Sequence, residues 1–238
     1  MKRLDLKKIV IDSLFPRRCP VCEEIVKGRY ICRECLKKLS FVGEPYCLKC
    51  GKPLVNLQDE YCMDCVRLPK SFDFGMALLN YDDITENAMI KIKYKNRREY
   101  IEPFAMMMAE RFRGKIEKMQ IDCLMPVPVH KSRLRERGFN QAEILANILG
   151  RQWDILVDTE TLYREKKTVA QKELTPQERL KNLTKAFGAN QLREGVRNIL
   201  LVDDIYTTGS TIEACTRVLR AKGAERIYYI SICIGNGA

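Results

Sequence analysis

The feature that most constrains the fold is one stretch near the C-terminal end of the chain, "NILLVDDIYTTGSTIEA" (residues 198–214). Four apolar residues run into two adjacent aspartates, and a hydroxyl-rich turn around one glycine leads into helical spacing. We expect a strand over 198–203, a helix over 210–222 that stops at Gly223, and a strand over 226–234. A strand, a helix and a strand in this order predict a parallel sheet, because parallel neighbours need a crossover connection.

Strands and helices alternate along the preceding residues as well, which predicts an α/β fold with a parallel sheet and helices on both faces. We expect strands over 72–81, 121–129 and 155–165, a helical stretch over 84–116 that is interrupted near Pro103, a helix over 140–152 with Asn140 as its N-cap, and a helix that opens at Thr175 with a capping box.

Eight of the eleven cysteines form four CxxC pairs near the N-terminus. Two thiolates separated by two residues can bind one tetrahedral zinc ion, and a second such pair completes its four ligands. The pairs therefore predict two structural Zn²⁺ sites, with a single site as the alternative and redox chemistry disfavoured. The simplest pairing is sequential, although the spacing also permits a cross-braced one. The predicted ligands are Cys19, Cys22, Cys32 and Cys35, then Cys47, Cys50, Cys62 and Cys65.

The cysteine pairs mark residues 1–66 as a separate zinc-ribbon module, which a short linker at 66–72 joins to a second module over 72–238. One interpretation is a small fold held together by metal. The other is a surface that binds nucleic acid or a protein partner through basic side chains, which are Lys27, Arg29, Arg33, Lys37, Lys38, Lys49 and Lys52.

The chain carries a formal net charge of +11, which favours phosphate-bearing partners. Two zinc ions, each held by four thiolates, would lower this charge to roughly +7. No run of about 18 apolar residues predicts a transmembrane segment, and no signal peptide is recognisable, so we expect a cytoplasmic protein. The amphipathic stretch "LDLKKIVIDSLF" is expected to dock on the ribbon, and peripheral contact with the inner membrane is the alternative.

The stretch 198–214 has the chemistry of a nucleotide site. Ligands of parallel sheets bind at the carboxyl ends of the strands, where Asp203 and Asp204 stand. The N-terminus of the following helix attracts a phosphate, and Gly209 lets the backbone approach it closely. Two carboxylates suit a pair of vicinal hydroxyls with a divalent cation nearby. The stretch therefore predicts a site for a ribose 5-phosphate.

The segment "ILLVDDIYTTGST" closely resembles the phosphoribosyl pyrophosphate motif of type I phosphoribosyltransferases. Response-regulator receiver domains also have paired acids after a strand, but near the N-terminus and without this turn. Four other blocks resemble the ComF family, which includes ComFC and GntX-like proteins. These blocks are "LFPRRCPVC", "IKIKYKNRREYIEPFA", "PVPVHKSRLRERGFNQAEILA" and "TVAQKELTPQERLKNLTKAF".

The resemblance implies a role for each matching residue. Asp203 and Asp204 would contact the ribose hydroxyls and influence Mg²⁺. The 5-phosphate would be held by Thr207, Thr208, Gly209, Ser210 and Thr211. The pyrophosphate would be held in a loop that follows the strand 121–129, by a subset of His130, Lys131, Arg133, Arg135 and Arg137. Further candidates are Lys93 in the variable hood, and Lys166 and Lys167 in a flexible loop. Instead of contacting pyrophosphate, His130 could act as a general base or be a solvated side chain. Lys166 and Lys167 could simply be exposed side chains without a ligand contact.

The same resemblance implies a phosphoribosyl pyrophosphate-binding protein that acts in natural transformation. It would handle incoming single-stranded DNA beside DNA-uptake proteins at the inner membrane, with Tyr30, Tyr46 and Tyr61 available to stack on bases or to pack the ribbon. The alternatives are a Mg²⁺-dependent phosphoribosyltransferase that releases pyrophosphate on an unidentified acceptor, and a GntX-like metabolic role. Because the ribbon lies far along the chain from the nucleotide turn, we expect changes of ribbon charge to leave phosphoribosyl pyrophosphate binding intact.

Overall fold

The structure is a computed structural model that describes residues 16–27, 30–165 and 182–235. Several sequence predictions concern residues outside these ranges. They are the N-terminal amphipathic stretch, Arg29, Lys166, Lys167 and the helix opening at Thr175.

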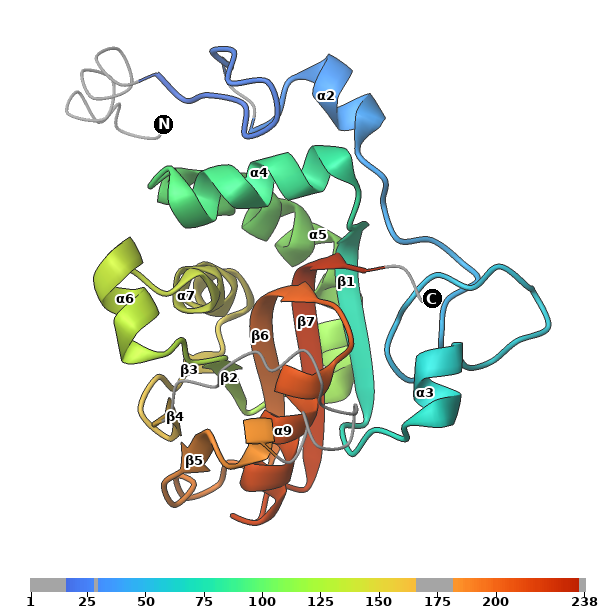
Figure 1. The fold of residues 1–238 in the computed structure, drawn as a ribbon, viewed down its shortest axis with the longest axis vertical. Coiled ribbons are helices and arrows are strands. Elements are labelled where there is room, and N and C mark those ends of the chain that lie inside the picture. Colours follow the sequence, from blue (N-terminus) through green and yellow to red (C-terminus); the bar gives the residue numbers. More distant parts are fainter. Residues whose placement is uncertain (1–15, 28–29, 166–181, 236–238) are drawn as a thin grey trace, which may run out of the picture.

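A five-stranded sheet forms the centre of the molecule, and every pair of neighbouring strands in it is parallel. The predicted α/β class is therefore confirmed (Figure 1). The order across the sheet is β1 (Phe74–Asn80), β7 (Arg226–Ile234), β6 (Asn198–Tyr206), β2 (Cys123–Pro126) and β3 (Leu156–Val157).

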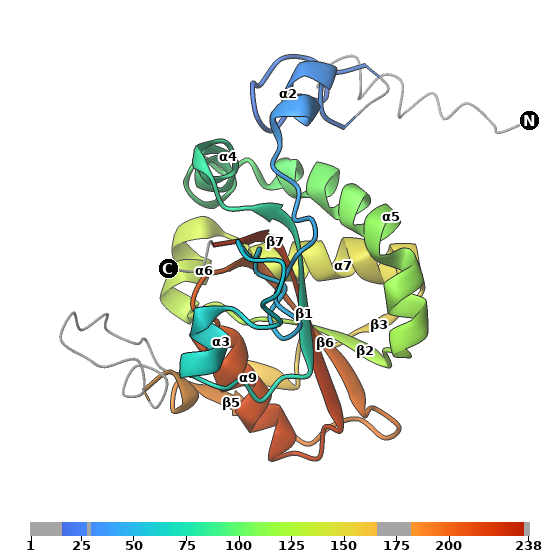
Figure 2. The ribbon, with the colours of Figure 1, turned by 90° about the vertical axis from the view of Figure 1, so that its right-hand side faces the viewer.

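Helices cover both faces of the sheet, as Figure 2 shows from the side. Alternate residues of β6 point to opposite faces because a strand has a period of two. Leu200 and Val202 pack in one apolar cluster with α4 (Asp83–Tyr94), α5 (Ile101–Met119) and α7 (Gln141–Trp153). Ile199 and Leu201 pack in a second cluster with α9 (Ser210–Arg220) on the other face.

Two helical predictions need correction. The break in 84–116 lies between α4 and the short 3₁₀ helix η1 (Arg98–Tyr100), ahead of Pro103. Pro103 instead occupies the first turn of α5, where a missing N–H costs no intrahelical bond. The basic segment after β2, expected as a loop, forms α6 (Lys131–Arg137), which ends at Gly138 in the left-handed conformation.

The strand predictions also differ in detail. The run 155–165 is split into β3 and β4 (Leu162–Arg164), and β4 pairs antiparallel with β5 (Phe187–Ala189) in a separate two-stranded sheet. Strand β6 continues to Tyr206, three residues beyond its predicted end, because it stays paired with β7. Among the described residues, no helix is long and apolar enough to cross a membrane.

The N-terminal module divides into two halves that dock on opposite faces of the sheet. Cysteines of the first half, which contains α2 (Arg33–Lys38), pack in the cluster of α4 and α5. Those of the second half, which contains α3 (Met63–Arg67), pack in the cluster of α9. The chain passes between them along the outer edge of β1, where the Val42 N–H donates to the Leu78 carbonyl over 3.1 Å. Because both halves share a core with the sheet, the division into modules 1–66 and 72–238 stays a prediction.

Candidate functional site

The acid pair lies in the last residues of β6, at the end of the sheet that α4 approaches. Lys93 of α4 reaches it, with its Nζ 2.9 Å from Oδ2 of Asp204, and both side chains are at most 19% exposed. The backbone N–H of Asp204 donates to Oδ1 of Asp203 over 2.8 Å. Burial, together with the neighbouring Asp204 carboxylate, raises the pKa of Asp203 to about 8. The pair therefore favours additional positive charge beside it.

The turn after β6 leads directly into α9. Gly209 has φ +76°, and a Cβ there would overlap the Tyr206 phenol, so the position requires glycine. No described side chain caps the N-terminus of α9, so its first N–H groups remain free to bind an anion. The hydroxyls of Thr208 and Ser210 lie 3.0 Å apart at the same end.

A cavity of about 290 Å³ joins the acid pair to this turn. Arg133 and Arg137 of α6 line it together with Arg164 of β4, which the sequence analysis missed because nothing in a short strand marks a lone arginine. Nε of Arg137 and Nε2 of Gln141 are buried and have no hydrogen-bond partner among the described residues. Buried donors of this kind fit an anionic ligand, since an unmet donor is costly.

The other predicted pyrophosphate residues lie elsewhere. His130 is the N-cap of α6, where its Nδ1 accepts a hydrogen bond from the Ser132 N–H over 3.1 Å. Lys131 and Arg135 are exposed and, like His130, are not among the residues that line the cavity. The structure thus brings together part of the predicted set, which is Lys93, Arg133, Arg137, Asp203, Asp204, Thr207 and Thr211.

These residues fit a phosphorylated sugar with a divalent cation. Carboxylate oxygens are ligands that Mg²⁺ prefers, and Asp203 and Asp204 offer them side by side. Arginine guanidinium groups match phosphate oxygens in bidentate pairs. The acidic end of the cavity thus suits the sugar hydroxyls and the cation, and its basic wall suits the phosphates.

The predicted linker, residues 66–72, contacts both α9 and the turn before it, residues 207–211, which is called the phosphate turn below after its predicted ligand. Nζ of Lys70, a residue only 8% exposed, donates to the Thr208 carbonyl over 3.1 Å. The N–H and the hydroxyl of Ser71 both donate to the buried Glu213 carboxylate of α9 over 2.7 Å. The linker therefore takes part in positioning the turn.

The cysteines form two separate clusters, and in each all four sulfur atoms lie within 4.8 Å of one another. The pairing is sequential, which decides between the two arrangements that the spacing permits. The sulfurs of Cys22 and Cys32 are 3.7 Å apart and those of Cys50 and Cys62 are 3.5 Å apart. Tetrahedral zinc with Zn–S bonds of about 2.3 Å places sulfurs about 3.8 Å apart. Both donor sets therefore fit zinc, and closed sets of four thiolates are structural.

The basic surface proposed for the ribbon needs one correction. Lys52 is only 2% exposed, and its Nζ lies 2.6 Å from Oδ2 of Asp64. The Lys52 ammonium cannot contact a phosphate, because it is shielded from solvent and is already paired with the Asp64 carboxylate. The other described members of the set are exposed or half-buried, and these are Lys27, Arg33, Lys37, Lys38 and Lys49.

Comparison with known families gives two matches that together cover most of the chain. Residues 10–66 match the double zinc ribbon domain, and residues 134–237 match the phosphoribosyl transferase domain. The fold and these matches define a protein in which a double zinc ribbon precedes a domain of the phosphoribosyltransferase class.

Similarity to individual proteins adds to these domain matches. Competence protein F of Haemophilus influenzae is 36% identical over 108 residues, covering 44% of this chain and 47% of the relative. Competence protein ComFC of Bacillus subtilis is 33% identical over 150 residues, covering 62% and 58%. The DNA utilization protein YhgH of Escherichia coli K12 is 33% identical over 112 residues, covering 47% and 49%. The chain is thus similar to competence proteins F and ComFC and to the DNA utilization protein YhgH, and it spans about half the length of the curated relatives it matches.

Solved structures also match part of the chain. The crystal structure of a purine phosphoribosyltransferase from Pyrococcus horikoshii Ot3 is 17% identical, covers 57% of this chain and 73% of that chain, and gives a TM-score of 0.34. This similarity is too low to carry an inference about the site.

Proposed function

We propose that this chain binds phosphoribosyl pyrophosphate with Mg²⁺ and acts in the handling of incoming single-stranded DNA. One observation carries the ligand assignment. The half-buried acid pair of β6, the uncapped N-terminus of α9 and the arginines of α6 and β4 converge on a single cavity. Vicinal hydroxyls, a phosphate monoester and a pyrophosphate are the groups that suit these three parts.

Each part of the cavity has a distinct task in this proposal. Asp203 and Asp204 would accept hydrogen bonds from the ribose hydroxyls and favour Mg²⁺ nearby. The turn from Thr207 to Thr211 would hold the 5-phosphate. Arg133, Arg137 and Arg164 would hold the pyrophosphate, while Lys93 neutralises Asp204 until the ligand is bound. Bound Mg²⁺ would supply the charge that offsets the pyrophosphate and the acid pair.

The DNA role rests on the relatives and on charge. Relatives are named as competence proteins and as DNA utilization proteins. The formal net charge of +11 stays positive after two zinc–thiolate sites are counted, and a positive surface attracts the phosphates of a single strand. DNA-uptake proteins at the inner membrane would be the partners that deliver such a strand.

One observation favours turnover as a second candidate function. Asn140 and Gln141 at the N-terminus of α7 also line the cavity, and Nε2 of Gln141 has no described hydrogen-bond partner. An acceptor with a carbonyl or phosphate oxygen would satisfy this amide. The chain would then catalyse attack of the acceptor on C1 of the sugar with release of pyrophosphate.

Titration calorimetry tests the ligand assignment. Phosphoribosyl pyrophosphate is expected to bind one site per chain with Mg²⁺ present and to bind far more weakly after chelation of Mg²⁺. Ribose 5-phosphate, which lacks the pyrophosphate, serves as the control and should bind more weakly. If phosphoribosyl pyrophosphate does not bind in the presence of Mg²⁺, the proposal is wrong. Pyrophosphate release in a metabolite extract separates turnover from binding alone.

A further inference from the structure

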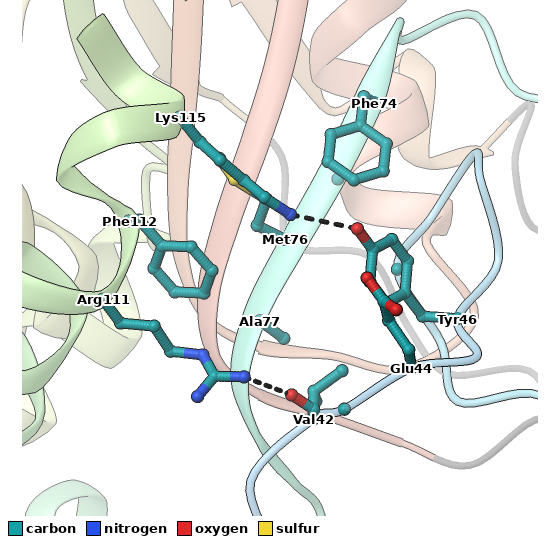
Figure 3. A pocket seen from close by; sticks show the side chains of 12 residues that line it. Val42, Glu44, Tyr46, Phe74, Met76, Ala77, Arg111, Phe112 and Lys115 are labelled. Atoms are coloured by element: carbon teal, nitrogen blue, oxygen red, sulfur yellow. Dashed lines mark hydrogen bonds between the residues drawn. The ribbon is translucent and has the colours of Figure 1, made fainter.

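A second cavity, of about 250 Å³, opens at the outer edge of β1, where the chain crosses from the first half of the ribbon to the second. Figure 3 shows that residues of the crossing segment form one wall and residues of α5 form the other. Main-chain bonds frame it at both ends, from the Val42 N–H to the Leu78 carbonyl and from the Gly75 N–H to the Lys49 carbonyl. The cavity is separate from the acid pair, since β7 lies between β1 and β6.

Two aromatic rings form part of its lining. The rings of Tyr46 and Phe74 have centroids 6.3 Å apart and are tilted by 48°, and both residues are half-buried. Rings this close to each other leave no room for a third ring between them. Nζ of Lys115 lies over both rings, 5.0 Å from the Tyr46 centroid and 5.8 Å from that of Phe74, so a planar ligand would stack on the face of Tyr46 that Lys115 does not cover. In Figure 3 the two rings lie side by side across from the α5 side chains.

Two cations of α5 line the opposite side, one helical turn apart. Arg111 donates from Nη2 to the Val42 carbonyl over 2.6 Å, and Nζ of Lys115 donates to the Tyr46 phenol over 3.1 Å. Neither forms an ion pair with a carboxylate of the described residues, and each retains further N–H donors. Lys118 is exposed and follows at helical spacing, so α5 presents a basic stripe of Arg111, Lys115 and Lys118.

Glu44 is the one acidic residue in the lining, and it belongs to the ribbon wall beside Tyr46 (Figure 3). Because the Glu44 carboxylate repels a phosphate, a phosphate would bind on the α5 side of the cavity. A carboxylate next to an aromatic ring accepts hydrogen bonds from exocyclic amino groups, which three of the four bases carry. The wall with Glu44 and Tyr46 therefore suits a base, and the wall with Arg111 and Lys115 suits its phosphates.

We propose that this cavity binds one nucleotide of a single strand, with the base stacked on Tyr46 and the flanking phosphates on Arg111 and Lys115. Aromatic platforms beside a basic track are how proteins hold unpaired strands. The volume falls below the range of about 300–1,000 Å³ for larger ligands, which suits one base. The inference rests on the proposed DNA role and locates the strand at the seam between ribbon and sheet.

The test measures binding of a fluorescently labelled single strand of roughly 12 nucleotides to the full chain at several salt concentrations. Lys115→Gln should reduce the log–log salt slope by about 0.7, the value for one phosphate of a single strand. Tyr46→Leu keeps an apolar side chain but removes the ring. It should weaken binding about fivefold to a hundredfold and leave the salt slope unchanged.

Arg113→Gln is the matched control, because it removes the same charge from the same helix. Arg113 donates to the Gln152 carbonyl instead of lining this cavity, so its slope should match that of the parent. Equal effects of Lys115→Gln and Arg113→Gln, or no effect of Tyr46→Leu, would overturn the location. Tighter binding of the duplex, or binding of thymidine 5′-monophosphate as tight as that of the strand, would also overturn it. A parent protein that binds no strand would instead overturn the proposed DNA role, while leaving phosphoribosyl pyrophosphate binding as a separate measurement.

Discussion

The phenol of Tyr229 donates a hydrogen bond of 2.5 Å to the backbone carbonyl of Cys50, a ligand position of the second cysteine cluster. The ring of Tyr229 stacks on that of Tyr206, with centroids 4.4 Å apart and planes 6° from parallel. Tyr206 in turn lies against Gly209 in the phosphate turn. The second half of the ribbon, the sheet and the phosphate turn are therefore one packed unit, although 159 residues separate Cys50 from Gly209 in the sequence.

Loss of the second metal site is expected to weaken phosphoribosyl pyrophosphate binding, because Cys50 would no longer be held beneath Tyr229. Cys62→Ser should lower the zinc content from two ions to one and reduce the affinity by about tenfold or more, equivalent to about 1.4 kcal/mol. Metal analysis and calorimetry on the same samples measure both quantities.

Cys22→Ser is the control for this prediction. Cys22 is exposed and belongs to the first cluster, which packs with α4 and α5 and not with the phosphate turn. It should lose one zinc ion without a change in ligand affinity. Equal losses of affinity in the two variants would contradict the link through Tyr229.

The acid pair is expected to dominate ligand affinity. Asp203→Asn combined with Asp204→Asn keeps the side-chain volume but removes the charge that favours Mg²⁺ and two charge-assisted hydrogen bonds. The cost should be about 3 kcal/mol or more, hence at least about a hundredfold in affinity by calorimetry. Unchanged affinity in the double variant would mean that the ligand binds elsewhere.

The free energy of unfolding without ligand should fall as the pH rises towards about 8. The pKa of Asp203 is about 8 in the folded chain, well above its usual value, so between these values the folded state keeps a proton that the unfolded state has released. Stability falls with rising pH wherever the folded state binds more protons, here by up to about 1.4 kcal/mol per pH unit.

Asp203→Asn carries no titrating proton and should lose this part of the slope. Urea unfolding of both proteins at about pH 6 and about pH 8 measures the difference, and zinc-dependent effects cancel because the cysteines are the same in both. A parent and a variant with parallel pH profiles would refute the raised pKa.

Gly209→Ala should abolish ligand binding and destabilise the fold. The φ of +76° strains any side chain by about 1–3 kcal/mol, and the new Cβ would collide with the Tyr206 phenol. Gly223→Ala is a matched control, since its φ is +95° but nothing lies within 4 Å of the added Cβ. It should cost stability in urea unfolding while the calorimetric affinity stays at the parental value. The opposite ranking of affinities would contradict the assignment of the turn.

The sequence alone determined the features that depend on neighbouring residues. The CxxC pairs predicted two zinc clusters because a short loop can bring two thiolates to one ion, and both clusters form with sequential pairing. The alternation of apolar runs and helical spacing predicted the parallel sheet, and the order of acids, glycine and hydroxyls predicted the turn into α9. Each of these follows from local geometry and from the period of the side chains.

Contacts between groups that are distant in the sequence follow from long-range packing. The pairing of Lys93 with Asp204 and the entry of Arg164 into the same cavity depend on how α4 and β4 pack against the sheet. Nothing in the sequence around Lys52 distinguishes it from its exposed neighbours, yet it is buried against Asp64. Distance along the chain suggested that the ribbon and the phosphate turn are independent. The two ribbon halves dock on opposite faces of the sheet, and only the second half reaches the turn. The sequence does not predict this arrangement, because long-range packing depends on the complementarity of whole surfaces and leaves no local pattern.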